Sequence, residues 1–188
     1  MSSVLKEKVG RYTIKIYNND EPFNPREDDN LGTMVCFHPR FNLGDKHNYR
    51  YRGRQDLEET IKRNENVGVI LPLYLYEHSG ITMNTTGFSC RWDTMFVGFI
   101  YITKEKMLEE FGGKRVGKHL RKRITEYLIG EVKVYDQYLT GDSFGFKIFK
   151  KKKEVDESWG YFGIDNCMTE AKSVVEGLIK YNNKTVDV

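Results

Sequence analysis

Short segments of the chain carry apolar residues with the period of a β-strand. Residues 12–18, YTIKIYN, alternate apolar and polar side chains and run into Asn-Asn-Asp, which predicts a strand followed by a turn. Residues 96–102, FVGFIYI, are largely aromatic or β-branched and uncharged, so we expect them at the centre of a sheet. The same reasoning predicts further strands at residues 33–38, 69–78 and 81–84, and a hairpin of residues 144–150 and 158–162 around a charged loop.

Pro72 lies within the predicted strand 69–78. Because proline has no amide hydrogen, it argues against a helix and against a central ladder position at that residue.

Other segments carry apolar residues at helical spacing. Val116, Leu120, Ile124 and Leu128 recur every four residues and predict a helix over residues 116–138. A terminal amphipathic helix is predicted from the apolar positions Met168, Ala171, Val175, Leu178 and Ile179.

Two shorter helices are predicted from their capping residues. Thr103 can cap a helix that ends at Gly112-Gly113. Asp56, with Glu59 three residues on, has the form of a capping box for a helix that ends near Asn66.

The order of these elements indicates the fold class. Strands dominate the first half, helices come later, and no regular βαβ alternation is visible. We therefore expect an α+β fold with a mainly antiparallel sheet and two or three amphipathic helices in the C-terminal half. We expect residues 1–188 to form a single domain, with a long irregular loop region at 19–55, where Pro22 and Pro25 disfavour regular structure.

Composition narrows the class of protein further. Of the 188 residues, 39% are hydrophobic, which is enough for a real core. No run is long and apolar enough for a membrane span, and the N-terminus lacks the apolar region of a secretory signal, so a cytoplasmic location is expected. The three cysteines have neither disulfide-framework nor zinc-site spacing, and we expect no cofactor.

The net charge of +3 is mild, but the cations are concentrated in particular segments. In KHNYRYRGR, residues 46–54, arginines alternate with tyrosines, which offers guanidinium groups for phosphates beside rings that can stack. We expect the basic residues at the start of the long helix to form a cationic ridge on the side away from its apolar stripe. The candidate binding residues are Tyr49, Arg50, Tyr51, Arg52, Arg54, Lys114, Arg115, Lys118, Arg121 and Lys122, and residues 150–153 add a third basic element.

A metal site is the alternative interpretation. Carboxylate and imidazole side chains suit a divalent cation that cleaves phosphodiesters, and the candidate ligands are Asp28, Asp29, His38 and His78. No metal-binding motif supports them, and Asp28, Asp29 and Asn30 could equally form a turn in which side-chain oxygens accept backbone amides.

Several strings resemble a family of small proteins, without assigned function, from tailed phages and prophages of low-GC Gram-positive and gut bacteria. They are DDNLGTMVCFH at 28–38, FNLGDKH at 41–47, ILPLYLYEHSGITM at 70–83, VGFIYITKEK at 97–106 and VYDQYLTGDSFGF at 134–146. The resemblance implies a non-enzymatic accessory protein in the cytoplasm of a bacterial host. Such proteins often act by occupying a host machine, and inhibitors of host defence nucleases such as CRISPR-Cas are one class of them.

Chemistry and resemblance together favour a protein that binds nucleic acid, or a host protein or ribonucleoprotein that processes it, and no membrane. A metal-dependent nuclease or phosphodiesterase, and a protein that sequesters a nucleotide signal in an aromatic pocket, remain the alternatives.

Overall fold

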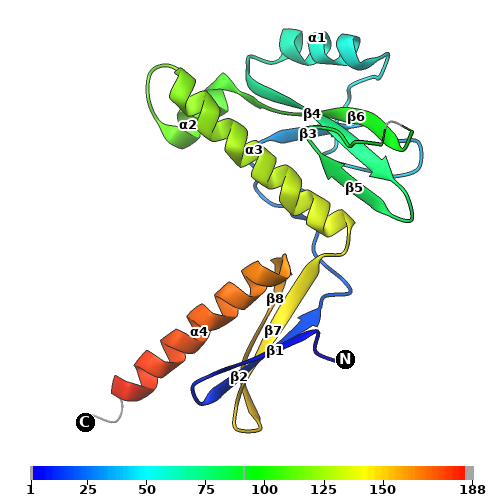
Figure 1. The fold of residues 1–188 in the computed structure, drawn as a ribbon. Coiled ribbons are helices and arrows are strands. Elements are labelled where there is room, and N and C mark those ends of the chain that lie inside the picture. The colour runs from blue at the N-terminus through cyan, green and yellow to red at the C-terminus, as the bar shows by residue number, and fades with distance from the viewer. Residues whose placement is uncertain (1, 91, 185–188) are drawn as a thin grey trace. The chain divides into compact units, whose positions relative to one another are not determined.

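The computed structural model of the chain describes residues 2–90 and 92–184 (Figure 1). Contacts divide it into two compact units. The terminal unit combines the first 23 residues with those from Gly141 onward, and the central unit is Asn24–Thr140. Each unit contains one four-stranded antiparallel sheet with helices, which confirms the α+β class.

The central unit holds eight of the described elements. In chain order they are η1 (Pro25–Glu27), β3 (Thr33–Cys36), α1 (Arg54–Asn64), β4 (Val67–Glu77), β5 (Ile81–Asn84), β6 (Thr94–Thr103), α2 (Lys104–Phe111) and α3 (Lys118–Leu139). The strand order is β3-β6-β4-β5, so β6 is an interior strand, as its apolar sequence predicts. Pro72 pairs with Phe99 of β6, whereas β5 pairs with β4 only at Tyr74–Glu77. The proline therefore avoids the doubly paired part of β4, as expected.

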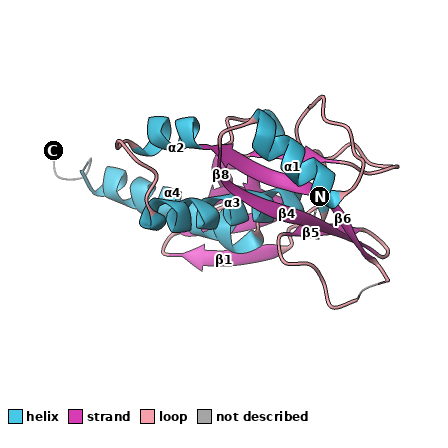
Figure 2. Cartoon of the chain, turned by 90° about the horizontal axis from the view of Figure 1, so that it is seen from above, coloured by secondary structure: helices cyan, strands magenta, loops and turns pink. Residues whose placement is uncertain are grey.

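Helices cover both faces of this sheet, because side chains alternate between the faces along each strand. Ile100 and Ile102 of β6 pack in one cluster with Ile124 and Leu128 of α3. Phe99 and Tyr101, between them, pack with α1 through a second cluster. Figure 2 shows α1 lying along the sheet. The buried face of α1 consists of Leu57 and Ile61, and its polar face is left for other contacts.

A buried ion network fixes the irregular segment before β3. The Arg26 guanidinium donates to both carboxylate oxygens of Asp45 at 2.8 Å, to Glu131 of α3 at 3.1 Å and to the Gly32 carbonyl at 2.7 Å. Glu131 also accepts the Leu31 amide at 2.6 Å. Burial alone would lower the pKa of Arg26, but Asp45 and then Glu131 raise it, so the group stays charged.

The terminal unit contains five described elements. They are β1 (Leu5–Val9), β2 (Tyr12–Asn18), β7 (Ser143–Lys150), β8 (Lys153–Phe162) and α4 (Ile164–Lys184). The strand order is β1-β2-β7-β8, and α4 packs Cys167, Ala171 and Val175 against one face of the sheet. The β7–β8 connection is a two-residue turn at Lys151 and Lys152, so the expectation of a loop over residues 151–157 was wrong.

Strand β1 was not predicted from the sequence. It forms a hairpin with β2 through Gly10 and Arg11, and Gly10 has a φ of 58°. A glycine with positive φ at the first position of a two-residue loop is typical of a type II′ hairpin, so the signal was present at Gly10. Within residues 2–90 and 92–184, no helix combines the length and apolar character needed to cross a membrane.

Candidate functional site

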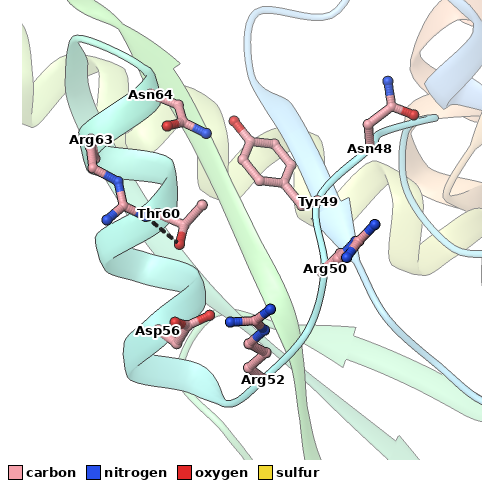
Figure 3. A pocket seen from close by; sticks show the side chains of 8 residues that line it. All are labelled: Asn48, Tyr49, Arg50, Arg52, Asp56, Thr60, Arg63 and Asn64. Atoms are coloured by element: carbon pink, nitrogen blue, oxygen red, sulfur yellow. Dashed lines mark hydrogen bonds between the residues drawn. The ribbon is translucent and has the colours of Figure 1, made fainter.

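A basic pocket lies between α1 and the loop that precedes it (Figure 3). We call it the loop pocket; its volume is about 290 Å³. The loop contributes Asn48, Tyr49, Arg50 and Arg52, and α1 contributes Asp56, Thr60, Arg63 and Asn64. The α1 residues are spaced at i, i+4, i+7 and i+8, so they form one polar stripe, on a different side of the helix from buried Leu57 and Ile61.

Tyr49 anchors the loop in this position. Its ring packs with the cluster that joins α1 to the sheet, and its hydroxyl lies 3.2 Å from Glu65 and 3.5 Å from the Tyr101 hydroxyl. Burial, followed by the bond to Tyr101, raises the pKa of Tyr49 far above its ordinary value. Tyr49 is thus a neutral structural anchor rather than a free stacking ring.

The arginines of the loop pocket keep their charge available. Among the described residues, Arg50, Arg52 and Arg63 make no ion pair, and Arg63 only donates to the Thr60 hydroxyl at 3.2 Å. Figure 3 places the Arg52 guanidinium between the loop and the start of α1. Asp56 is the one carboxylate lining this pocket, so three arginines leave a net positive charge.

A second basic pocket lies where α2 and α3 meet the start of β4. We call it the helix pocket; its volume is about 360 Å³. Its lining is Asn66, Lys104, Glu105, Leu108, Lys114, Arg115, Val116 and Arg121, which places four cations against one carboxylate. The side-chain oxygen of Asn66 accepts a hydrogen bond from Lys104 at 2.9 Å, and its amide group donates one to Glu105 at 2.5 Å. These polar side chains are therefore ordered.

The expected ridge on α3 needs correction. Lys114 and Arg115 precede the helix, which begins at Lys118. Arg121 is not turned away from the apolar stripe, because its guanidinium donates to the Gly68 carbonyl of β4 and lines the helix pocket. Lys118 and Lys122 are exposed on α3 and line neither pocket.

The two pockets are neighbours along the chain. Asn64 lines the loop pocket and Asn66 lines the helix pocket, with Glu65 alone between them. Consecutive Cα atoms are 3.8 Å apart, so the Cα atoms of Asn64 and Asn66 lie at most about 7.6 Å apart. We call the cations that line either pocket the basic strip; they are Arg50, Arg52, Arg63, Lys104, Lys114, Arg115 and Arg121.

Tyr51 lines a different feature, an aromatic groove of about 420 Å³, and Arg54 contacts Phe96, one of the rings of that groove. Its lining is Phe37, His38, Pro39, Tyr51, Met95 and Phe96. Arg54 lies over the rings of Phe96 and Tyr74, at 5.1 and 5.7 Å, and donates to the Tyr74 hydroxyl at 2.7 Å. The structure therefore divides residues 46–54 between the loop pocket and the aromatic groove.

The structure does not assemble the candidate metal ligands. Asp28 and Asp29 are exposed, and the Asp28 carboxylate accepts the Asp29 amide at 3.0 Å, as in the turn interpretation. His38 accepts two backbone amides at Nδ1, and burial, with the charge of Arg40, lowers its pKa. His78 is exposed beside Ser79. Across the described part of the chain, no three His, Cys, Asp or Glu side chains are grouped as metal ligands.

Sequence reasoning missed two members of the basic strip, Arg63 and Lys104. Arg63 could have been found from the polar stripe of its predicted helix, which it shares with Asp56 and Thr60. Lys104 carried no such signal, because its role depends on how α2 meets β4.

Comparisons of the chain with protein-family models, with curated proteins and with solved structures found no match. The site is therefore interpreted from its own chemistry.

Proposed function

We propose that the protein binds nucleic acid through the basic strip, either free or as the exposed nucleic acid of a host ribonucleoprotein. The supporting observation is that seven cations line two pockets whose described linings include two carboxylates. The pockets approach each other at Asn64 and Asn66, which are two positions apart in the chain. Like charges gathered in this way repel one another, and a chain of phosphates relieves the repulsion. Each phosphate contact also releases counterions, which drives binding at low salt.

The chemistry of the strip suits phosphate contacts better than base recognition. Arginine guanidinium groups bind phosphate oxygens through two parallel hydrogen bonds, and five of the seven cations are arginines. Tyr49, one of the two tyrosines expected to stack beside them, is half-buried and packs against the cluster that joins α1 to the sheet. The strip should therefore recognise the sugar–phosphate backbone with little preference for sequence.

The resemblance to phage proteins extends the proposal to a target. A guide-loaded CRISPR-Cas nuclease, or another host nucleic-acid-processing complex, displays phosphates on a large surface that such a strip could occupy. Binding would then inhibit the host enzyme without any chemistry by the protein itself.

Charge reversal within the loop pocket tests the proposal. In the double variant Arg52→Glu/Arg63→Glu, affinity for labelled 20-base-pair RNA and DNA duplexes, measured by fluorescence anisotropy, should fall at least about tenfold, because two attractive contacts become repulsive. The matched control is Lys133→Glu, at an exposed lysine of α3 that lines neither pocket, and it should bind as the parent does. Equal losses of affinity in the double variant and in Lys133→Glu, or no loss in the double variant, would show that the basic strip is not the binding site.

A further inference from the structure

The sheet of the terminal unit has a second face, opposite α4, which the basic strip does not involve. On the inner face, Ile14 and Ile16 of β2 and Phe146 and Ile148 of β7 pack in the cluster that includes α4. The residues between them on β2 and β7 point to the other side. We call that side the outer face. It consists of these residues of β2 and β7 and their cross-strand neighbours on β1 and β8, namely Lys6, Lys8, Thr13, Lys15, Tyr17, Gly145, Lys147, Phe149, Glu154, Glu157 and Trp159.

The ion pairs of β1 are consistent with this assignment. Glu7 pairs with Lys172 of α4 at 2.8 Å, so Glu7 lies on the inner side. Its neighbours Lys6 and Lys8 must then point to the outer face, because side chains alternate along a strand.

Three lysines lie side by side on the outer face. In the strand register, Lys6 is opposite Lys15, and Lys15 is opposite Lys147. Lys147 is neutralised by Glu154 at 3.1 Å and Glu157 at 2.9 Å. Among the described residues, neither Lys6 nor Lys15 has a carboxylate within ion-pair distance.

Like charges that face each other across strands are destabilising. The uncompensated pair of Lys6 and Lys15 also lines a pocket of about 270 Å³, together with Thr13, Phe149, Lys151 and Lys152. Of the described residues, four lysines therefore line this pocket and no acid does. Lys15 lies 4.6 Å from the Phe149 ring centroid, which holds its ammonium group at the sheet surface.

An aromatic platform lies beside these lysines. Trp159 of β8 is opposite Gly145 of β7, and a Cβ atom at residue 145 would clash with the indole ring. The glycine thus allows the indole to lie against the sheet, where Trp159 remains 39% exposed. The Tyr17 ring lies 6.3 Å away, on the other side of Gly145 in the register.

We propose that the outer face is a second nucleic-acid site, specific for single strands. Bases would stack on Trp159 and Tyr17, while phosphates contact Lys6, Lys15, Lys151 and Lys152. Rings on a flat sheet combined with cations bind unpaired bases, whose faces are free to stack. A duplex keeps those faces inside its own stack. This site is separate from the basic strip and does not depend on it.

Tryptophan fluorescence can test this site directly. The chain has two tryptophans, and Trp92 is 96% exposed, so Trp92→Phe leaves Trp159 as the one reporter with little structural cost. Unlabelled 12-nucleotide oligothymidine and oligouridine should quench this signal in a saturable, salt-sensitive way. A 12-base-pair duplex should bind at least about tenfold more weakly by the same signal.

Substitution of Lys15 separates binding from folding. In the Trp92→Phe background, Lys15→Glu should weaken single-strand binding at least about tenfold, because repulsion replaces attraction. The melting temperature should stay the same or rise, since the new carboxylate lies between Lys6 and Lys147. Lys180→Glu, at an exposed position of α4, makes the same charge change and should leave the quenching intact.

Several outcomes would overturn the proposal. They are an absence of quenching, quenching of equal strength by the duplex, or equal losses in the Lys15 and Lys180 variants. The basic-strip variant Arg52→Glu/Arg63→Glu should retain the Trp159 signal, so failure of one site can be told from failure of the other.

Discussion

At the scale of single residues, burial determines which polar side chains are available for function. Asp45 lies in the same irregular segment as the candidate metal ligand Asp28, but its carboxylate accepts hydrogen bonds from Arg26 and, at 2.7 Å, from the Met34 amide. Asp28 stays exposed. Two acids in one segment thus have unrelated roles, because Asp45 binds the buried Arg26, which is 9% exposed, whereas Asp28 faces solvent.

Removal of the Asp45 charge should strongly destabilise the protein. We expect Asp45→Asn to lower the free energy of unfolding by about 3 kcal/mol, because it leaves a buried guanidinium short of a partner. Urea denaturation monitored by circular dichroism would measure the loss. Asp28→Asn is the matched control and should change stability by less than about 0.5 kcal/mol. Equal stability of the two variants would contradict the structural role of the network.

The cysteines provide a second prediction at this scale. Burial raises the pKa of the Cys36 thiol to about 12 and that of Cys167 to about 11. Since the thiolate is the reactive form, both should resist alkylation at pH 8 in the folded protein, whereas half-buried Cys90 should react first. Mass spectrometry after brief iodoacetamide treatment would locate the label. Labelling of Cys167 before Cys90 would contradict the packing of α4.

At the scale of elements, capping decides where helices begin. Thr103 caps α2 by accepting the Lys106 amide at 3.2 Å, as the sequence predicts. The prediction for Asp56 was wrong, because α1 begins at Arg54 with Gly53 as its N-cap residue. Asp56 lies inside the first turn instead, where it faces the loop pocket.

These two side chains should respond differently to truncation. Thr103→Ala should cost about 1 kcal/mol of unfolding free energy, because it removes a cap bond. Asp56→Ala should cost less, about 0.5 kcal/mol, because only its interaction with the helix dipole is lost. It should also tighten nucleic-acid binding in the anisotropy assay, since the pocket loses its one carboxylate. Weaker binding by Asp56→Ala would argue against phosphate contacts in the loop pocket.

At the scale of the whole molecule, the chain forms its terminal unit from segments that flank the central unit in sequence. Pairing of β2 with β7 brings together residues more than 120 positions apart, such as Ile16 and Phe146. The cations are correspondingly divided, with the basic strip in the central unit and the lysine-rich outer face in the terminal unit. A net charge of only +3 conceals both surfaces.

Salt dependence should reveal these surfaces despite the mild net charge. If all seven cations of the basic strip contact phosphates, the logarithm of the affinity for a DNA duplex should fall with the logarithm of salt concentration with a slope of about −6. The Arg52→Glu/Arg63→Glu variant should have a slope shallower by at least about 1. A slope near zero in the parent protein would mean that phosphates do not drive binding.

The local pattern alone determined much of the fold. Strand β2 and strand β5 lie at their predicted residues, and α2 begins after its predicted cap, because side-chain alternation and capping are properties of neighbouring residues. The α+β class followed from the order of these elements. Strand β1, whose residues Leu5–Val9 include three charges, lacked an apolar pattern and owes its place to pairing with β2.

Only the tertiary structure decided which charged residues act together. The sequence identified the cationic segments, but it could not place Tyr49 against the cluster between α1 and the sheet, Arg54 over the Phe96 ring or Arg121 at the Gly68 carbonyl. It also could not join Arg63 to Arg52, or Lys6 to Lys15, as neighbours. These relations depend on long-range packing and strand register, which the spacing of residues along one chain does not encode.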